Sequence, residues 1–383
     1  MKYCWIEDIE EFQLIADEWD KTLLSSGNYN PFLLSDFIVT FWKHYRYNRR
    51  LFILVIREGR DILGGIPLYL ERESSTFGFA RVLRYVGKTA ANYTEPLYGT
   101  SNFEMLPLLI NALFKRKDWD ALHLTDVRSE SRLIMEYNKY PHGHMLLSSV
   151  LQDHMNWAID LSVGKDKYMQ SIPKKLKKDL MAKRRYADKN YGKLKFRQIG
   201  GKEEIERYFD LYAKFSCNTF RLRYEKSAFE NQDYLNFIRE LLIILDEKQR
   251  LDAHILLAGD KVLAISFAYR FGRGFNWILT GYNYEYKYVR PGYLMIEELI
   301  NELFNRGETY YNWYGHIKFY KIQWCNSQSP LFQFFLIRPN LRGIWYWKLQ
   351  QIKSRLKADK NFMDLASKIR RIPRRLKQPI PLI

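Results

Sequence analysis

One stretch of the chain, residues 275–300, constrains the fold more than any other part of the sequence. Residues 275–281 are largely apolar or aromatic and predict a strand, and the polar connection 282–289 leads into a helix that opens at Pro291-Gly292. The start of a helix leaves backbone N–H groups without partners and carries the positive end of the helix dipole, so it suits a phosphate group. The same pattern also fits a plain stop-and-start signal, and the motif alone leaves both interpretations open.

The elements around this stretch follow an order that occurs in both halves of the chain. Residues 51–56 and 62–70 predict a hairpin in the first half, and residues 253–258 and 262–270 predict another in the second half. The remaining predicted elements are helices at 12–24, 35–45 and 105–114 and strands at 81–87, 95–98, 121–125 and 309–314. Aligning 62–64 with 262–264 separates the hairpins by about one domain length. A chance match is the alternative, but the repeated order favours a tandem duplication in an α+β fold with mixed sheets.

The length and the cysteine content limit the class of protein. A chain of 383 residues exceeds one ordinary core, so two domains are expected. Cys4, Cys217 and Cys325 are far apart and match neither a disulfide framework nor a metal site, so we expect no metal and a reducing compartment. The first residues lack the apolar core of a signal peptide, and no run approaches the ~20 apolar residues that span a bilayer. These features predict a cytoplasmic protein.

Positive charge is concentrated in two segments. The formal net charge is +18; residues 165–197 contain 13 Lys and Arg, and residues 338–383 contain 13 more, so the rest of the chain is nearly neutral. Both segments have apolar residues at helical spacing, and the second includes the Trp345-Tyr346-Trp347 cluster. An anionic membrane surface, a nucleic acid and a plain solvated helix each fit this pattern. The aromatic cluster favours peripheral contact with the inner membrane face through residues 338–383, and nucleic acid is less favoured.

The order of several short motifs resembles a known family. They are Trp19 with Asn30-Pro31-Phe32-Leu33-Leu34-Ser35 and Trp42, then Gly64-Gly65-Ile66-Pro67-Leu68, the basic helix ending in Arg184-Arg185, Arg290-Pro291-Gly292-Tyr293-Leu294, and Asn312-Trp313-Tyr314-Gly315 with Tyr320-Lys321 and Trp324. Together they resemble the bacterial tandem acyltransferases of the GNAT superfamily, of the cellulose-biosynthesis (CelD-like) acetyltransferase type. This family is distantly similar to the FemABX-type transferases of peptidoglycan bridge synthesis.

The resemblance implies two GNAT-like domains. They would be an N-terminal domain at 1–160, a basic linking helix at 161–195, a C-terminal acyltransferase domain at 196–337 and a basic amphipathic tail at 338–383. It also implies that acyl-CoA, as co-substrate, binds to the second domain. The sequence departs from the family between Gly315 and Tyr320, where residues 316–319 contain no carboxylate. This departure puts a general base at that place in doubt.

The resemblance assigns roles to particular residues. The backbone around Leu279, Thr280 and Gly281 would hold the pantetheine arm and the thioester carbonyl. Pyrophosphate would lie on Arg290 and on the amides of Gly292, Tyr293 and Leu294, with Lys321 as a further phosphate contact. Asn312 would hydrogen-bond the pantetheine arm. The expected catalytic residues are Tyr320 as the acid for the departing thiolate, with Glu95 and His316 as candidate bases.

Each role has a structural alternative. Tyr320 suits a half-buried anchor, Asn312 suits a turn, and Lys321 suits a solvated surface. Arg290 has possible ion-pair partners in Glu297 and Glu298.

Three functions are consistent with these features. The first is transfer of an acyl group, with acetyl favoured, from acyl-CoA to an amine or hydroxyl of a sugar, polysaccharide or cell-envelope precursor. The second is an aminoacyl-tRNA-dependent transferase of the peptidoglycan type, which predicts steep salt dependence of binding. The third is a non-catalytic scaffold in polysaccharide synthesis. The sequence does not identify the acceptor.

Overall fold

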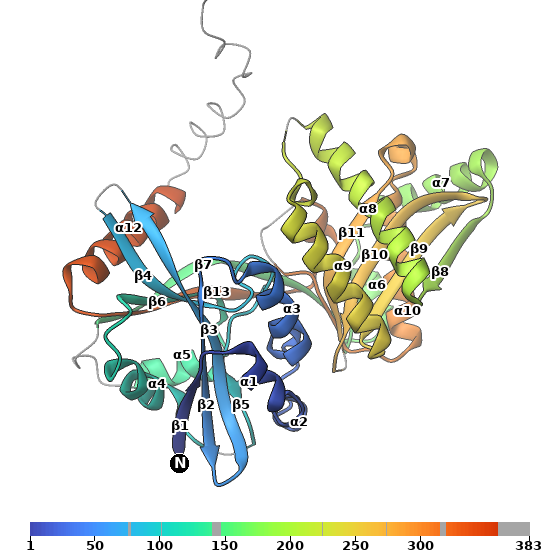
Figure 1. Cartoon of the computed structure of the whole chain (residues 1–383). Coiled ribbons are helices and arrows are strands. Elements are labelled where there is room, and N and C mark those ends of the chain that lie inside the picture. The colour runs from blue at the N-terminus through green and yellow to red at the C-terminus, as the bar shows by residue number, and fades with distance from the viewer. Residues whose placement is uncertain are drawn as a thin grey trace, which may run out of the picture.

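A computed structural model describes residues 1–75, 78–100, 102–139, 147–223, 225–272, 274–314 and 319–358. The strands in these ranges form one continuous mixed sheet in the order β1-β2-β3-β4-β6-β13-β7-β12-β11-β10-β9-β8, with β5 paired to β3. Figure 1 shows this sheet running through two lobes, one built mainly from each half of the chain. The predicted α+β class with two tandem GNAT-like units is confirmed.

The N-terminal lobe contains the first hairpin and the helices that cover it. Its strands are β1 (Lys2–Ile6), β2 (Arg50–Glu58), β3 (Asp61–Ser75), β4 (Gly78–Tyr85), β5 (Leu97–Tyr98), β6 (Ala121–Arg128) and β7 (Leu147–Asp160). Its helices are α1 (Ile9–Leu14), α2 (Ala16–Ser25), η1 (Pro31–Leu33), α3 (Ser35–Tyr45), α4 (Met105–Phe114) and α5 (Arg132–Lys139). The Gly64-Gly65 pair has a packing reason, because a Cβ at either position would collide with a neighbouring strand carbonyl and with the ring of Phe103 or Trp19.

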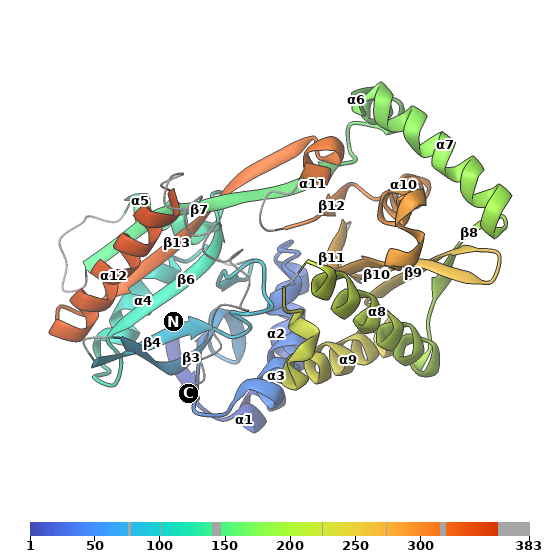
Figure 2. The same cartoon turned by 90° about the horizontal axis from the view of Figure 1, so that it is seen from above.

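The C-terminal lobe repeats this plan. Its strands are β8 (Leu194–Ile199), β9 (Leu251–Ala258), β10 (Lys261–Arg270), β11 (Gly274–Tyr282), β12 (Tyr310–Asn312) and β13 (Ser327–Ile337). Its helices are α6 (Lys165–Ser171), α7 (Lys174–Tyr191), α8 (Lys202–Leu222), η2 (Ala228–Glu230), α9 (Gln232–Glu247), η3 (Tyr284–Val289), α10 (Pro291–Asn305) and α11 (Phe319–Trp324). The last helix, α12 (Leu341–Ala358), follows β13 in the chain but packs on β4, β6 and β13 in the N-terminal lobe (Figure 1). Helices α8 and α9 lie on one side of its strands, and α10 lies on the other (Figure 2).

The two hairpins share an irregularity that sequence alignment anticipates. Leu63 is the extra residue of a β-bulge in the β2–β3 pair, because Ile56 faces Gly64 and Arg57 faces Ile62. Leu263 is the extra residue at the corresponding place in the β9–β10 pair. A bulge bends its strand and is retained for geometric reasons, so its occurrence at both aligned positions supports the duplication.

The two lobes exchange strands. β13, from the C-terminal half, lies between β6 and β7 of the N-terminal half, and β7 in turn pairs with β12. The sheet therefore continues from one lobe to the other through hydrogen-bonded strands. The predicted boundaries at 160, 195 and 337 stay a prediction.

Most predicted elements appear with small shifts at their ends, and two are divided. The predicted helix 12–24 is broken at Ile15, where α1 ends and α2 begins. The basic linking segment forms two helices, α6 and α7, separated by Ile172 and Pro173. Within the described residues, no helix is both long and apolar enough to cross a membrane.

Candidate functional site

The parallel strands β11 and β12 part after a short paired region. Their register joins Gly274 to Tyr310, Phe275 to Tyr311 and Asn276 to Asn312, and β11 then continues to Tyr282 without β12. Just beyond the last shared rung, Ile278 is the extra residue of a β-bulge against β10. Bulges twist a strand away from its neighbour and are frequent beside active sites. Beyond Asn276, β11 therefore no longer pairs with β12, and the bulge is a feature that the sequence did not indicate.

Residues 279–281, the expected donor-binding segment, lie on the part of β11 that pairs with β10 but not with β12. Leu279 is buried, and the Thr280 hydroxyl accepts a hydrogen bond from Trp277 Nε1 at 2.9 Å and lies 2.9 Å from Ser266 Oγ. Gly281 faces α8, where an added Cβ would lie 2.7 Å from the ring of Tyr212. A side chain at 281 would therefore displace α8 from the sheet.

Helix α10 begins without a side-chain cap. Arg290 is its N-cap in the left-handed conformation, with φ of 52°, and Pro291 occupies the first turn. The amides of Tyr293 and Leu294 donate to the Arg290 carbonyl at 3.0 and 3.2 Å. The amide of Gly292 has no hydrogen-bond partner within the described residues. Of the amides that the sequence analysis assigned to pyrophosphate, those of Tyr293 and Leu294 are thus already hydrogen-bonded, and the assignment itself stays a prediction.

The Arg290 side chain forms an ion pair that the sequence analysis did not anticipate. Its guanidinium lies 2.8 Å from Asp179 of α7 and remains about half exposed. It also lies 5.4 Å from the ring centroid of Tyr293. Glu297 and Glu298 instead bind Arg184, at 2.8 and 2.7 Å. Helix α7 is therefore fastened to the first turns of α10 by two ion-pair clusters.

Asn312 and Lys321 are both buried and hydrogen-bonded. Asn312 Nδ2 donates to the Tyr93 hydroxyl at 2.7 Å, which joins the two lobes, and its Oδ1 accepts from the Tyr314 amide at 3.2 Å. The Lys321 ammonium donates to the carbonyls of Trp313, at 3.2 Å, and Tyr314. A solvated surface position for Lys321 is therefore wrong, since only 6% of the residue is exposed.

The three expected catalytic residues have different outcomes. Tyr320 lies in α11, but the placement of its side chain is not described, and His316 lies outside the described residues. Glu95 is 3% exposed and forms a two-pronged pair with Arg128, whose Nε and Nη2 atoms lie 2.8 and 2.7 Å from its two carboxylate oxygens. Burial works to lower the pKa of Arg128, but the charge and hydrogen bonds of Glu95 raise it further. Both oxygens of this carboxylate are therefore engaged by one guanidinium, an arrangement that fixes its position.

A cavity of about 630 Å³ lies between the two lobes. Its walls come from the loop after α2, the segment around Glu95, the end of β6 and the first residues of β11 and β12. Asn276 and Asn312 line it, and these residues form the last shared rung before β11 and β12 part. The cavity therefore meets the parted strands at the point where they separate. Local sequence patterns did not predict this cavity, because its walls come from five separate segments.

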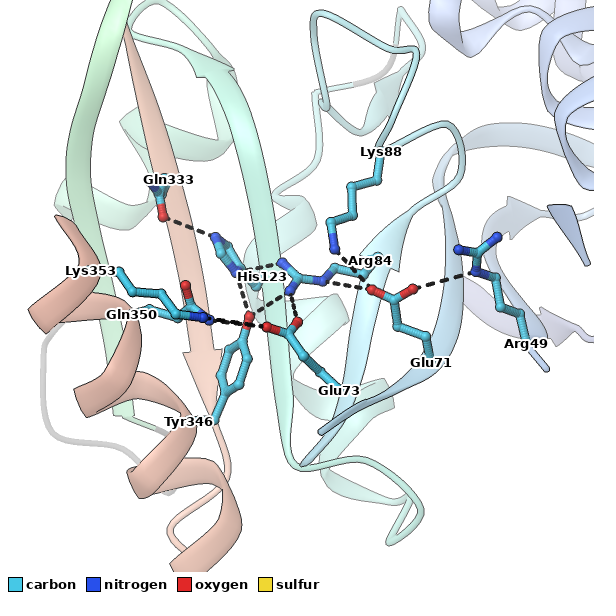
Figure 3. A network of polar contacts seen from close by, with 10 residues as sticks. All are labelled: Arg49, Glu71, Glu73, Arg84, Lys88, His123, Gln333, Tyr346, Gln350 and Lys353. Atoms are coloured by element: carbon cyan, nitrogen blue, oxygen red, sulfur yellow. Dashed lines mark hydrogen bonds and ion pairs between the residues drawn. The ribbon is translucent and has the colours of Figure 1, made fainter. Parts of the chain in front are cut away.

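The corresponding place in the N-terminal lobe is closed. β4 and β6 are parallel and pair only at Val82–Ala121 and Leu83–Leu122, and β4 has no bulge against β3. Beyond the last rung, Arg84 Nη1 lies 2.5 Å from His123 Nδ1, and both contact the hydroxyl of Tyr346 from α12 at 2.7 Å (Figure 3). These side chains hold the separated strand ends together.

The network around Arg84 contains further charged groups, which Figure 3 shows between β3, β4 and α12. Arg84 pairs with Glu71 and Glu73, and Lys88 lies 2.9 Å from Glu71.

Helix α4, which corresponds to α10, also differs at its start, because the Leu106 amide donates to the Glu136 carboxylate at 2.7 Å. Burial raises the pKa of Glu136. In this lobe the helix opening already holds an anionic side chain.

Comparisons with known proteins agree with this geometry. Residues 174–321 match the family model described as an acetyltransferase (GNAT) domain. The chain has the tandem GNAT fold. A search of curated proteins gives no significant match.

Among solved structures, the chain is similar to FemX, with 11% identity over 91% of this chain and 99% of that one and a TM-score of 0.60. It is also similar to a conserved protein of unknown function from Bacteroides thetaiotaomicron, with 13% identity over 88% and 100% and a TM-score of 0.53. At these identities the likeness shows a shared overall fold.

Proposed function

We propose that this protein is an acyltransferase that moves an acyl group, with acetyl favoured, from acyl-CoA to an amine or hydroxyl of an acceptor bound between the lobes. The observation that carries the proposal is the shared rung, Asn276 and Asn312. It borders the opening between β11 and β12 on one side and the interlobe cavity on the other. A donor thioester in the opening and an acceptor in the cavity would meet there. Holding two reactants together in the right orientation supplies a large part of the rate acceleration in group transfer.

The donor would be held by the unpaired edge of β11 and the start of α10. Free backbone amides near the Ile278 bulge would stabilise negative charge that develops on the thioester oxygen. The Gly292 amide and Arg290 would contact the diphosphate. Tyr320 is the proposed proton donor to the leaving thiolate. Glu95, because Arg128 engages both of its oxygens, is proposed to orient the acceptor, and the identity of the base is left to experiment.

The cavity suits an acceptor with many hydroxyl or amide groups. Its lining includes four tyrosines, Tyr29, Tyr93, Tyr98 and Tyr310, together with Asn28. Aromatic rings with a few placed polar groups are typical of small-molecule sites, and ring faces pack well against sugar C–H groups. We therefore favour a sugar, polysaccharide or cell-envelope precursor as acceptor. Such a reaction belongs in the cytoplasm, with residues 338–383 near the inner membrane face as the expected peripheral contact.

The test is calorimetric titration of the full chain with acetyl-CoA and longer acyl-CoA thioesters. We expect one binding site, weakened at least several-fold in Arg290→Ala. Lys202→Ala, which removes a positive charge from an exposed position at the start of α8, is the control for a general loss of charge in this lobe. Absence of binding for every thioester, or an Arg290→Ala protein that binds as the wild type does, would remove acyl-CoA as donor. Turnover is then followed as free thiol release with amino sugars and hydroxylated sugars, and Tyr320→Phe is expected to slow it.

A second donor is an aminoacyl group carried on RNA. The likeness to FemX over nearly the whole chain favours it. This donor predicts aminoacyl-tRNA binding that weakens steeply as salt rises, because binding would release counterions from the RNA. Binding of charged tRNA with no binding of CoA thioesters would select this second function over the first.

A further inference from the structure

Helix α7 lies along the outer edge of the C-terminal lobe, and Figures 1 and 2 both place it away from the N-terminal lobe. Leu176, Leu180 and Ala187 form its buried side and pack in the core of this lobe. The helix contacts η3, β8, β9 and α10, so its position on the lobe is fixed. The opposite side of its 18 residues faces outward.

The outward side of α7 carries positive charge that nothing nearby neutralises. Its exposed cations are Lys174, Lys175, Lys178, Arg185 and Lys189, and none of them forms an ion pair within the described part of the chain. The two acidic residues of α7 are engaged elsewhere. Asp179 binds Arg290, and Asp188 accepts a hydrogen bond from the Leu194 amide at 2.8 Å. The surface is therefore strongly complementary to an anionic partner.

Large apolar and aromatic side chains lie among these cations. Met181 is 60% exposed on α7, and Tyr288 of η3 is 61% exposed beside it. The ring of Tyr186 packs edge-on against Tyr288 with centroids 4.9 Å apart, and the Lys183 ammonium lies 3.8 Å from the Tyr288 centroid. On the helix surface the exposed cations lie between Met181 and the Tyr186–Tyr288 pair. Exposed Met and Tyr beside lysines are characteristic of helices that lie in a bilayer interface.

The other basic helix uses its aromatic residues internally. In α12, Tyr346 is 5% exposed and contacts Arg84 and His123, and Trp347 packs against the same cluster. Trp345 remains about half exposed. The aromatic residues of α12 thus mainly attach this helix to the sheet. The exposed apolar residues of α7, in contrast, remain available to contact a partner.

We propose that the α7–η3 face, comprising the five cations above with Met181, Tyr186 and Tyr288, binds the surface of a bilayer that contains anionic lipid. Lysines contact the headgroup phosphates, and Met181 and the tyrosines enter the headgroup zone. RNA is the less suitable partner, because base stacking needs free ring faces and one face of Tyr288 already carries the Lys183 ammonium. The inference stands on this surface alone and does not depend on the identity of the acyl donor.

The experiment is flotation of the full chain with vesicles of phosphatidylcholine containing roughly one third phosphatidylglycerol, compared with phosphatidylcholine alone. We expect binding only to the anionic vesicles. Lys174→Gln and Lys178→Gln should each lower the partition coefficient about fivefold, since a basic residue near such a surface is worth about 1 kcal/mol. The matched controls Lys21→Gln and Lys117→Gln remove the same charge from exposed positions in the N-terminal lobe and should leave binding unchanged.

Met181→Gln separates a membrane from an RNA surface. Insertion into the headgroup zone requires an apolar side chain, so this variant should bind the anionic vesicles several-fold more weakly while binding of a single-stranded RNA oligomer stays as in the wild type. Equal binding to neutral and anionic vesicles would overturn the proposal. It would also be overturned if Met181→Gln had no effect while the lysine variants weakened RNA binding more than vesicle binding.

Discussion

The two lobes follow one plan, yet they differ where each GNAT unit parts its parallel strands. β11 bends at the Ile278 bulge and leaves β12, and the helix that follows starts with an uncapped turn. In the N-terminal lobe β4 lacks the bulge, Arg84 and His123 bridge the separated ends, and Glu136 occupies the helix start. The difference indicates that the two lobes share a scaffold, while within the described residues only the C-terminal lobe leaves this place open. The N-terminal lobe uses the same place to fasten α12.

The largest expected effect comes from breaking the closed lobe. Arg84→Met should lower the free energy of unfolding by about 3–5 kcal/mol, because it leaves Glu71 and Glu73 without their buried partner. The measurement is urea unfolding followed by tryptophan fluorescence. Arg290→Met, the matched change in the open lobe, should cost less than about 1 kcal/mol, since its ion pair is partly exposed and screened by solvent. Equal losses in the two variants would mean that the lobes do not differ as described.

The next largest effect is expected from a substitution that makes the start of α10 resemble the start of α4. Gly292→Glu places a carboxylate beside the expected diphosphate, as Glu136 does at the start of α4, and should weaken acyl-CoA binding roughly 100-fold through like-charge repulsion. An added Cβ at 292 would meet only the ring of Tyr282 at 3.4 Å, so the neutral control Gly292→Ala should still bind. The titration in calorimetry measures both.

The reverse change tests the closed lobe. Glu136→Gln removes the carboxylate from the start of α4, but Arg84, His123 and Tyr346 still hold the strand ends together. The number of acyl-CoA sites should therefore stay at one per chain. A second site in this variant would show that Glu136 alone keeps the N-terminal lobe from binding the donor.

A smaller effect is expected in the pH dependence of stability, and both lobes contribute. His123 stacks on Phe335 and His254 on Phe196, and burial lowers the pKa of both, to about 4 for His254. Below pH 6.5 the unfolded chain takes up protons that the folded chain does not, so stability falls as pH falls.

Each of these histidines should add a slope of about 1.4 kcal/mol per pH unit, and the contribution of His254 should end near pH 4. Urea unfolding at a series of pH values measures the slope. His123→Gln and His254→Gln should each reduce it, and a slope unchanged by either substitution would contradict the assignment of neutral buried histidines.

Local patterns in the sequence predicted much of the fold. Helix α4 has the predicted bounds, and the two hairpins and the opening of α10 at Pro291 appear where residue periodicity and the Pro-Gly signal place them. Such signals depend on neighbours a few residues apart. The exchange of β7 and β13 was not predictable in this way, since strand order depends on partners far apart in the chain, and the apolar pattern of a strand does not name its partner.

The candidate site was predictable only in part, for the same reason. The segment 279–281, Arg290 and Gly292 lie on the predicted strand and helix start. The partners that decide their chemistry come from elsewhere: Asp179 binds Arg290, and Tyr93 binds Asn312. Glu95 has its partner Arg128 at the end of another strand. The sequence identified positions, whereas the charge state and availability of each side chain depended on contacts between segments.

The smallest expected effect concerns the ion pair that limits Arg290. Asp179→Asn keeps the shape of the side chain and removes its charge. The positive charge of Arg290 is then no longer partly neutralised by a carboxylate and attracts the donor more strongly. Acyl-CoA affinity should rise about two- to fivefold, because an exposed pair of this kind is worth no more than about 1 kcal/mol. Asp188→Asn is the matched control, since Asp188 lies on the same helix and binds the Leu194 amide instead.

The gain in affinity should shrink as salt is added, because free ions screen an exposed charge. A fall in affinity for Asp179→Asn would instead mean that the carboxylate holds the guanidinium in the orientation that binds diphosphate. In that case Asp179 of α7 would position Arg290 for the donor. The anion site of the open lobe would then depend on this ion pair as well as on the uncapped start of α10.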